Sequence, residues 1–199
     1  SSAGEEQTAD IPLYNDFEIT QATPLLDADG SLGAWGWARQ ARMTYDRTLV
    51  KQSVSDRLKE WEFYCVMSPD CYMEITLADI SWAELTMVSV VDYLTGESYA
   101  NLRFGLSSDY FTLPSDPYGD TVFDNAGAHV SYAYEEPIRT LSFDFPWAVV
   151  LPAIKGAIAI EHRPSDERLA TAMPFDFAGS FFYTNKIVGM PAAGEITVN

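Results

Sequence analysis

The sequence has no long apolar run and few basic residues, and both absences exclude classes of protein. No stretch reaches the roughly 18 consecutive apolar residues typical of a membrane-spanning helix, so we expect no membrane span. Only 12 Lys and Arg residues stand against 29 Asp and Glu residues, which gives a formal net charge of −17. Because nucleic acids and anionic membranes are bound by basic patches, this charge argues against both as partners.

Motifs for the common chemistries are also missing. The sequence contains no GxSxG nucleophile elbow, no phosphate-binding glycine loop and no HExxH metal motif. His129 and His162 are far apart in the chain and outside any ligand-spaced cluster, so we read each as a surface or hydrogen-bonded strand residue. The sequence therefore predicts neither a bound metal nor a cofactor.

Cysteine is nearly absent, and the two that occur, Cys65 and Cys71, flank a predicted turn. In the expected register they lie directly opposite each other across a hairpin, where a disulfide is geometrically possible. Their spacing is not a CxxC redox motif, and no second pair exists for zinc. The alternative, which we favour, is two reduced core thiols of a cytoplasmic protein.

What the sequence does contain is period-2 alternation of apolar residues, clearest between residues 57 and 94. Successive side chains of a strand point to opposite faces, so this alternation predicts three strands with one apolar face. The short connections between them predict antiparallel pairing, since parallel strands need long crossovers. Six residues are expected to share one buried face: Trp61, Phe63, Met73, Ile75, Leu85 and Met87.

Similar patterns along the chain predict about twelve strands and no convincing helix. We expect the strands near residues 42–50, 60–68, 71–79, 83–94, 97–105, 121–124, 128–134, 138–145, 154–163, 168–174, 180–188 and 194–198. So many strands are too many for one flat sheet, which should close or fold over. Residues 1–20 are predicted to be a flexible acidic lead-in and 21–199 a single domain. The longest irregular stretch covers residues 106–120.

Several motifs together resemble the N-terminal part of an uncharacterised bacterial and fungal family. They are Pro24-Leu25-Leu26-Asp27, Gly36-Trp37-Ala38-Arg39, the segment from Arg57 to Tyr64, Leu77-Ala78-Asp79-Ile80, the segment from Phe182 to Ile187, and Met190-Pro191-Ala192-Ala193-Gly194. That family is similar to the lipocalin-like two-barrel superfamily of carotenoid 1,2-hydratase, the AttH-like proteins and the fungal Diels–Alderases. The resemblance implies an all-β, antiparallel meander that closes into a lipocalin-like barrel.

The same resemblance implies that residues 21–199 are the N-terminal half of a longer, two-barrel protein. The family's usual length exceeds 199 residues, and a strand-like segment, Glu195 to Val198, stands at the end of this sequence. An unpaired strand edge invites pairing. We therefore expect a second β-barrel as partner, either a C-terminal half or another copy of the chain. The family carries no agreed catalytic residues, so the motifs bring positions but no roles.

Candidate site residues follow from charge and aromatic content. In the expected hairpin register Glu62 lies opposite Glu74, and such a carboxylate pair can have a raised pKa and serve in acid/base catalysis; the alternative is a solvated outer face. Arg57, Lys59 and Lys186 can neutralise an anionic ligand group at a barrel mouth, or else form surface ion pairs with Glu60. The further candidates for ligand binding are Trp37, Arg39, Trp61, Tyr64, Tyr183 and Asn185.

Three functions remain open at the level of sequence. The first is binding of a large apolar small molecule in a β-barrel cavity, as in a carrier, because the chain is rich in aromatic residues. The second is a hydratase, cyclase or isomerase acting on a polyene, terpenoid or polyketide-like substrate. The third is a structural or protein-interaction barrel. A buried carboxylate or tyrosine in a cavity favours the enzyme, and a cavity lined only by hydrocarbon favours the carrier.

Overall fold

A computed structural model of the protein describes residues 17–106, 110–176 and 179–199, and nearly all of its regular structure is β-strand. A 3-10 turn at Arg47–Leu49 and one four-residue helix, α1 (Gln52–Ser55), are the exceptions among these residues. The strands are β1 (Thr23–Pro24), β2 (Gly36–Ala38), β3 (Met43–Thr44), β4 (Glu60–Met67), β5 (Cys71–Asp79), β6 (Glu84–Asp92), β7 (Ser98–Gly105), β8 (Thr121–Asn125), β9 (Ala128–Glu135), β10 (Ile138–Phe145), β11 (Ile154–Glu161), β12 (Leu169–Pro174), β13 (Phe181–Lys186) and β14 (Ala192–Val198).

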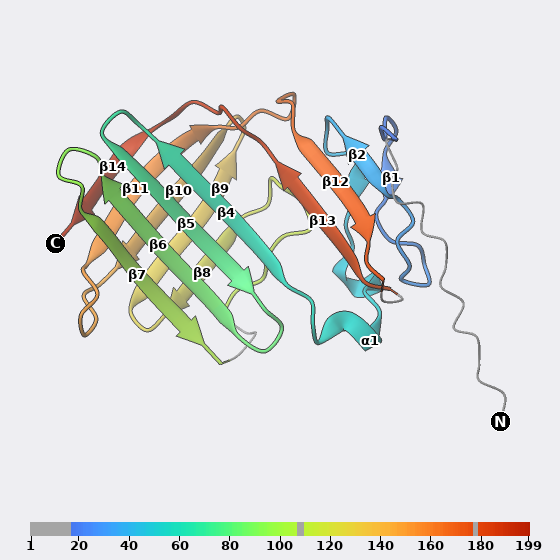
Figure 1. The fold of residues 1–199 in the computed structure, drawn as a ribbon, viewed down its shortest axis with the longest axis horizontal. Coiled ribbons are helices and arrows are strands. Elements are labelled where there is room, and N and C mark those ends of the chain that lie inside the picture. Colours follow the sequence, from blue (N-terminus) through green and yellow to red (C-terminus); the bar gives the residue numbers. More distant parts are fainter. Residues whose placement is uncertain (1–16, 107–109, 177–178) are drawn as a thin grey trace.

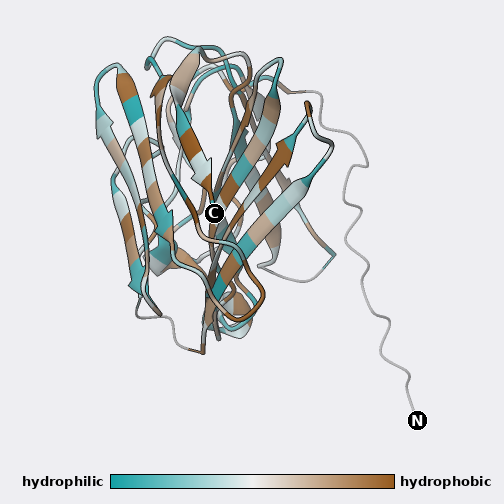
Figure 2. Ribbon diagram, turned by 90° about the vertical axis from the view of Figure 1, so that its left-hand side faces the viewer, coloured by the Kyte–Doolittle hydropathy of each residue, from teal (hydrophilic) through white to brown (hydrophobic). Residues whose placement is uncertain are grey.

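Two antiparallel sheets lie face to face and make the larger lobe (Figure 1). One has the strand order β4-β5-β6-β7 and the other β14-β11-β10-β9-β8. Hydrophobic and hydrophilic residues alternate along these strands (Figure 2), as half-buried strands require. The core between the sheets is built from Met73, Ile75, Leu77, Val88, Phe123, Val130, Tyr132, Leu141, Phe143, Ile154, Ile158 and their neighbours.

A smaller lobe stands beside this pair of sheets (Figure 1). Its sheet has the order β13-β12-β2, and β1 and β3 form a short parallel pair next to it. Its own core contains Leu25, Leu26, Ala34, Ala38, Met43, Ala170 and Ala172.

The predicted strand at 42–50 is wrong beyond Thr44, where β3 ends. Asp46 accepts hydrogen bonds from the amide and hydroxyl of Thr48, which starts the 3-10 turn instead.

The buried face predicted for the first three long strands is wrong for two of them. Met73 and Ile75 are fully buried, but Trp61 is 52% exposed and Phe63 47% exposed. The inward positions of β4 and β6 are instead the partly polar ones, among them Glu62, Tyr64, Glu84, Thr86 and Val88. Residues of β4 alternate regularly between its two faces. Hydrophobicity alone therefore favours the face with Trp61 and Phe63 as the buried one, although this face points outward.

The hairpin register also differs from the predicted one. The predicted register placed Cys65 opposite Cys71 and Glu62 opposite Glu74. In the structure Met67 pairs with Tyr72, which places Cys65 opposite Glu74 and Glu62 opposite Leu77. Because inward positions are even-numbered on β4 and odd-numbered on β5, Glu62 and Glu74 lie on opposite faces of the sheet. The predicted carboxylate pair is therefore wrong, and both cysteines are free thiols rather than a cross-hairpin disulfide.

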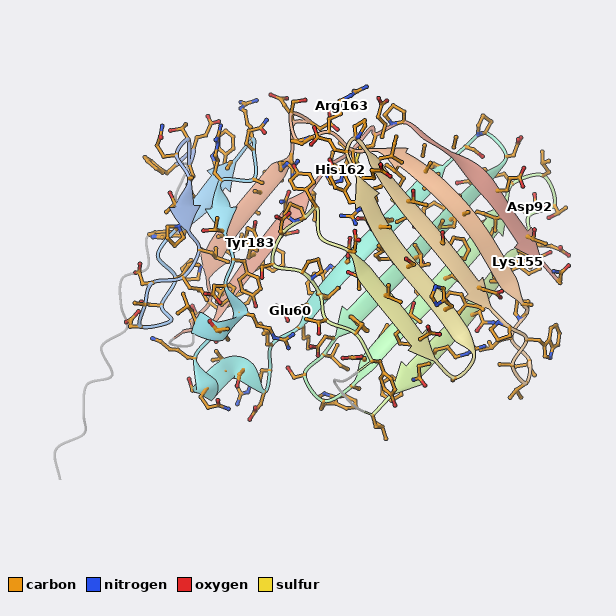
Figure 3. All side chains as sticks on the ribbon, turned by 180° about the vertical axis from the view of Figure 1, so that it is seen from behind. Glu60, Asp92, Lys155, His162, Arg163 and Tyr183 are labelled. Atoms are coloured by element: carbon orange, nitrogen blue, oxygen red, sulfur yellow. The ribbon has the colours of Figure 1, made fainter. Side chains whose placement is uncertain are left out.

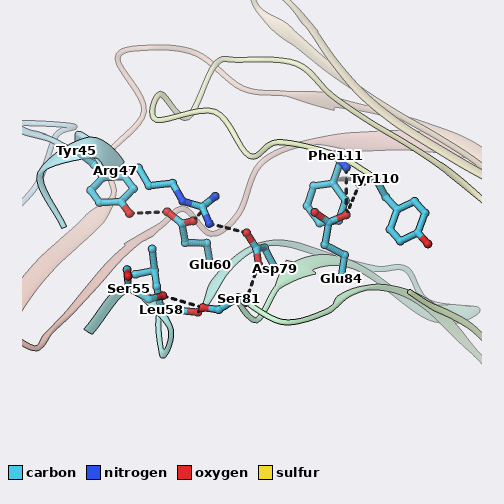
Figure 4. Close-up of polar contacts among 10 residues, drawn as sticks. All are labelled: Tyr45, Arg47, Ser55, Leu58, Glu60, Asp79, Ser81, Glu84, Tyr110 and Phe111. Atoms are coloured by element: carbon cyan, nitrogen blue, oxygen red, sulfur yellow. Dashed lines mark hydrogen bonds and ion pairs between the residues drawn. The ribbon is translucent and has the colours of Figure 1, made fainter. Parts of the chain in front are cut away.

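Polar groups on the inner face fasten the long loop to the sheet. Glu84 is fully buried on β6, and its carboxylate accepts the amides of Tyr110 and Phe111 at 2.9 and 3.1 Å (Figure 4). These two hydrogen bonds hold the segment that begins at Tyr110 against the inner face of the sheet. Residues 107–109 of the predicted loop and residues 1–16 of the predicted lead-in lie outside the described residues. Strand pairing in the described residues leaves four separate sheets and does not confirm a closed barrel.

Candidate functional site

A partly open cavity of about 1500 Å³ lies where the smaller lobe meets the larger one. Figure 3 shows Tyr183 on the small sheet and Glu60 and His162 on the large lobe around this junction. Strands β4 and β13 are both sheet edges, and the junction between them is not closed by strand pairing among the described residues. Small-molecule sites usually measure about 300–1,000 Å³, so the cavity is large enough for a sizeable ligand.

The wall of the cavity is mainly apolar, with a few polar groups at defined places. Its apolar residues come from both lobes and include Val66, Leu113, Ile158, Ile160, Phe181, Met190 and Ile196. Polar residues interrupt this lining at several places, among them Glu62 with Tyr64 on β4, the pair His162 and Arg168, and Asn185 on β13. A cavity of this kind holds a ligand mainly by its apolar surface and orients it by a few polar contacts.

Glu62 is one acidic residue of the cavity wall, which also includes Glu60, Asp116 and Asp176. Its carboxylate accepts hydrogen bonds from the hydroxyl of Tyr64 at 2.6 Å and from the hydroxyl of Thr121 at 3.2 Å. Burial raises the pKa of Glu62, although both hydrogen bonds and the nearby charge of Arg139 act in the opposite direction. A carboxyl group with a raised pKa beside a tyrosine is suited to proton transfer.

Two further groups surround this acid from inside the larger lobe. Tyr132 is fully buried, its ring meets that of Tyr64 edge-on at 5.1 Å, and its hydroxyl has no hydrogen-bond partner among the described residues. Arg139 is fully buried as well and donates to the carbonyls of Gly119 and Pro117 at 2.8 and 2.7 Å. Burial, followed by the charge of Glu62, raises the pKa of Tyr132 well above its usual range.

His162 and Arg168 form the basic side of the cavity. The His162 ring packs against Tyr118 and Tyr134, with ring centroids 5.0 and 5.6 Å away, and neither ring nitrogen has a hydrogen-bond partner in the described part of the chain. Burial and then the charges of Arg168 and Arg139 lower the pKa of His162 from 6.5 to about 4. His162 is therefore neutral at pH 7, so Arg168 carries the positive charge here.

A separate network explains the burial of Glu60 at the base of β4. Tyr45 donates to the Glu60 carboxylate at 2.5 Å, and Arg47 bridges Glu60 at 2.9 Å and Asp79 at 2.7 Å (Figure 4). These bonds join the smaller lobe to the end of the four-stranded sheet. The sequence predicted surface ion pairs of Glu60 with Arg57, Lys59 or Lys186, whereas Arg47 is its ion-pair partner in the structure.

Most of the predicted ligand-binding residues border the cavity, and their role stays a prediction. Those that line it are Arg57, Lys59, Trp61, Tyr64, Tyr183, Asn185 and Lys186. Arg57, Lys59 and Lys186 are exposed residues. Asn185 differs from them because its side-chain oxygen is buried without a hydrogen-bond partner in the described residues.

Three predicted residues lie elsewhere. Arg39 stacks over Trp37 at 5.4 Å and forms an ion pair with Glu18 at 3.3 Å, and neither Trp37 nor Arg39 lines this cavity. Glu74 is on the outer face of β5, where it accepts hydrogen bonds from Tyr72 at 2.5 Å and Ser89 at 3.2 Å. These three residues therefore make their contacts elsewhere on the fold and not at the junction between the lobes.

Sequence reasoning missed His162, Arg168 and Tyr132. The interpretation of His162 as a surface or hydrogen-bonded side chain is wrong, because the residue is 4% exposed and its ring nitrogens have no described partner. Arg168 begins the approach to β12, next to acidic residues that make it look like an exposed, paired cation. Tertiary packing buries these groups, within the larger lobe for Tyr132 and His162, and no local pattern carries that information.

The described residues contain no cluster of three or more His, Cys, Asp and Glu placed to hold a metal ion. Within the same residues, no helix has the length and apolar character needed to cross a membrane.

Fold and site together define an antiparallel all-β protein with a partly open, mainly apolar cavity between two lobes. Residues 16–199 match the family model described as a domain of unknown function (DUF2804), and the chain belongs to this family. No curated protein and no solved structure gives a significant match to it.

Proposed function

We propose that the protein binds a large apolar small molecule in the cavity between its two lobes. The observation that carries this proposal is the cavity itself, about 1500 Å³ and lined by apolar side chains of both lobes. Burying apolar ligand surface yields roughly 25 cal/mol per Å² before the costs of association are subtracted, so such a wall can hold a ligand with little chemistry. The lipocalin-like, two-barrel affiliation belongs to the same proposal and would account for a ligand cavity at this position.

Native mass spectrometry of the protein purified from its source tests this function. We expect a bound species above the bare chain mass that organic extraction releases as an apolar molecule. A protein that always has the bare mass, and that takes up no added retinol, would argue against the binding function.

A second candidate function is acid/base catalysis on a polyene, terpenoid or polyketide-like substrate, as in a hydratase or isomerase. The hydrogen-bonded carboxyl of Glu62, with its raised pKa, favours it. In a hydration, protonated Glu62 would give its proton to one alkene carbon and water would add to the other. The added water would then return a proton to the Glu62 carboxylate, so that alkene and water become an alcohol. Glu62→Gln would remove this turnover and keep ligand binding, whereas unchanged turnover would exclude the role.

The proposed partner is a second β-barrel, and the structure offers a surface for it. The outer face of the four-stranded sheet exposes a set of large apolar residues: Trp61, Phe63, Met67, Trp82, Leu102 and Phe104. Exposed apolar patches of this kind mark interaction sites, and sheets pack face to face over such surfaces. In a preparation of this chain alone, the second barrel available is another copy. A purely structural role for the protein would need this face but not the cavity.

A further inference from the structure

Three arginines among the described residues of this acidic chain are buried, and they differ in their hydrogen-bond partners. Arg103, Arg139 and Arg168 are 6%, 0% and 5% exposed, and none of them forms an ion pair with a described carboxylate. Arg103 donates to the carbonyls of Pro146, Leu102 and Ala126. Backbone carbonyls therefore satisfy Arg103, and they accept from both terminal nitrogens of Arg139, whose Nε alone is buried without a hydrogen-bond partner in the described residues.

Among the described residues, the side chain of Arg168 has one hydrogen-bond partner. Its Nη2 donates to the hydroxyl of Tyr118 at 2.6 Å, and its guanidinium carbon lies 5.5 Å from the centroid of the Tyr118 ring. Its Nε and Nη1 are buried without any hydrogen bond to a described residue. Since Nε carries one proton and Nη1 two, three N–H donors of a permanently charged group are left without acceptors.

Such an arrangement is costly unless something supplies an acceptor. Burying an unpaired charge is strongly unfavourable, and a guanidinium cannot escape the cost by losing its proton. The neighbouring His162 is neutral at pH 7, so its ring adds no counter-charge. Of the two acidic residues next to Arg168 in sequence, Asp166 accepts the amide of Arg163 at 2.8 Å and Glu167 approaches Arg39 at 3.9 Å.

The unsatisfied groups border the cavity. Arg168, His162 and Asn185 all line it, and Asn185 adds a buried oxygen without a hydrogen-bond partner among the described residues. The rest of the wall is mainly apolar, so a ligand that satisfies Arg168 must be apolar over most of its length. A single arginine beside a neutral histidine suits one negative charge, and the net charge of −17 disfavours polyanions such as phosphates.

We infer that Arg168 anchors the carboxylate of an otherwise apolar ligand, with Tyr118 holding the guanidinium in place and His162 and Asn185 beside the bound head group. This inference rests on the proposed binding function, whose ligand it assigns to the class of apolar monocarboxylic acids. A carboxylate accepts charge-assisted hydrogen bonds from a guanidinium, which are about twice as strong as neutral ones.

The test compares two probes that share an apolar body, all-trans-retinoic acid and all-trans-retinol, in equilibrium titrations at pH 7.5 followed by quenching of tryptophan emission. We expect the wild type to bind the acid about tenfold or more tightly than the alcohol, as one hydrogen bond to a charged group implies. Arg168→Met should bind both probes equally, with the loss confined to the acid. Lys155→Met removes an exposed charge at a residue of β11 that does not line the cavity, and should keep the preference.

The results separate the two levels of the proposal. Binding of neither probe to the wild type would overturn the binding function and the anchor with it. Equal binding of acid and alcohol by the wild type, or a preference that survives in Arg168→Met, would overturn the anchor alone.

Thermal unfolding of the ligand-free protein gives a second readout. Replacing an unpaired buried charge by an apolar residue is neutral or stabilising, so Arg168→Met should melt at or above the wild-type temperature. Arg139→Met should melt lower, because it leaves the carbonyls of Gly119 and Pro117 without donors. An Arg168→Met variant as destabilised as Arg139→Met would mean that Arg168 is structural, and would contradict the anchor.

Discussion

The hydroxyl of Tyr64 donates a 2.6 Å hydrogen bond to the carboxylate of Glu62, two residues earlier on the same inward face of β4. This contact places an acid and a tyrosine side by side at the border of the cavity. The ring of Tyr132 packs edge-on against the ring of Tyr64. The inner face of the sheet is thus partly polar, and the outer face carries exposed aromatic residues.

The first prediction concerns the pH dependence caused by Glu62. Its folded-state pKa is raised above the ordinary value of 4.5, so the folded protein holds this proton more tightly than the unfolded chain. The contribution to stability is therefore present at low pH and is lost as the pH rises from about 4.5 through the raised pKa. Glu62→Gln should flatten this loss in urea unfolding between pH 4 and 8. A variant that keeps the wild-type slope would show that another group is responsible.

The second prediction concerns His162, whose pKa is lowered from 6.5 to about 4. The unfolded chain takes up a proton on this residue first, so stability is lost as the pH falls from about 6.5 to about 4. This shift corresponds to a loss of up to about 3 kcal/mol. His162→Phe should remove it from acid-unfolding curves. His129→Phe, a control at a half-exposed histidine, should retain it; identical acid profiles for His162→Phe and the wild type would refute the assignment.

The third prediction tests which face of the four-stranded sheet is buried. Ile75 is fully buried, so Ile75→Ala should lower the free energy of unfolding by about 2–5 kcal/mol. Phe63 is 47% exposed on the other face, so Phe63→Ala should cost much less, below about 1.5 kcal/mol. Urea denaturation of both variants measures the difference. A larger loss at Phe63 than at Ile75 would reverse the inward and outward faces.

The fourth prediction concerns association through the outer face. Light scattering with size-exclusion chromatography at low micromolar concentration should show a dimer of the 22.1 kDa chain. The double variant Phe63→Ser and Phe104→Ser should shift it toward monomer, since both residues are exposed on that face. Val149→Ser, at a 91% exposed residue away from the four strands, is the matched control. A wild type that is monomeric throughout would exclude the second copy as partner.

The strands were largely predictable from the sequence, because period-2 alternation depends only on backbone geometry. The predicted segments at 71–79 and 138–145 coincide with β5 and β10. The direction in which each face points was not predictable, since it depends on what covers the sheet. Trp61 and Phe63 are more apolar than Glu62 and Tyr64, yet the latter pair points inward.

The candidate site was less predictable for a related reason. Residues on β4 and β13 were found because their segments carry recognisable motifs and strong strand patterns. Arg168 and His162 are buried by contacts with distant segments, through Tyr118 from the long loop and Tyr134 from β9. The hairpin register, with Met67 opposite Tyr72, separates Glu62 from Glu74. Strand register and the packing of distant segments depend on tertiary structure, which short-range patterns do not encode.

The central claim is that the cavity between the lobes binds an apolar small molecule. The most direct test is a titration with retinol, followed by the enhancement of its own emission, in the wild type and two variants. Val66→Phe adds a ring to the cavity wall, whereas Val122→Phe adds one at a 50% exposed position on β8. We predict saturable binding with one site per chain, weakened about tenfold or more by Val66→Phe and unchanged by Val122→Phe. An absence of saturable binding, or equal affinities in all three proteins, would contradict the account.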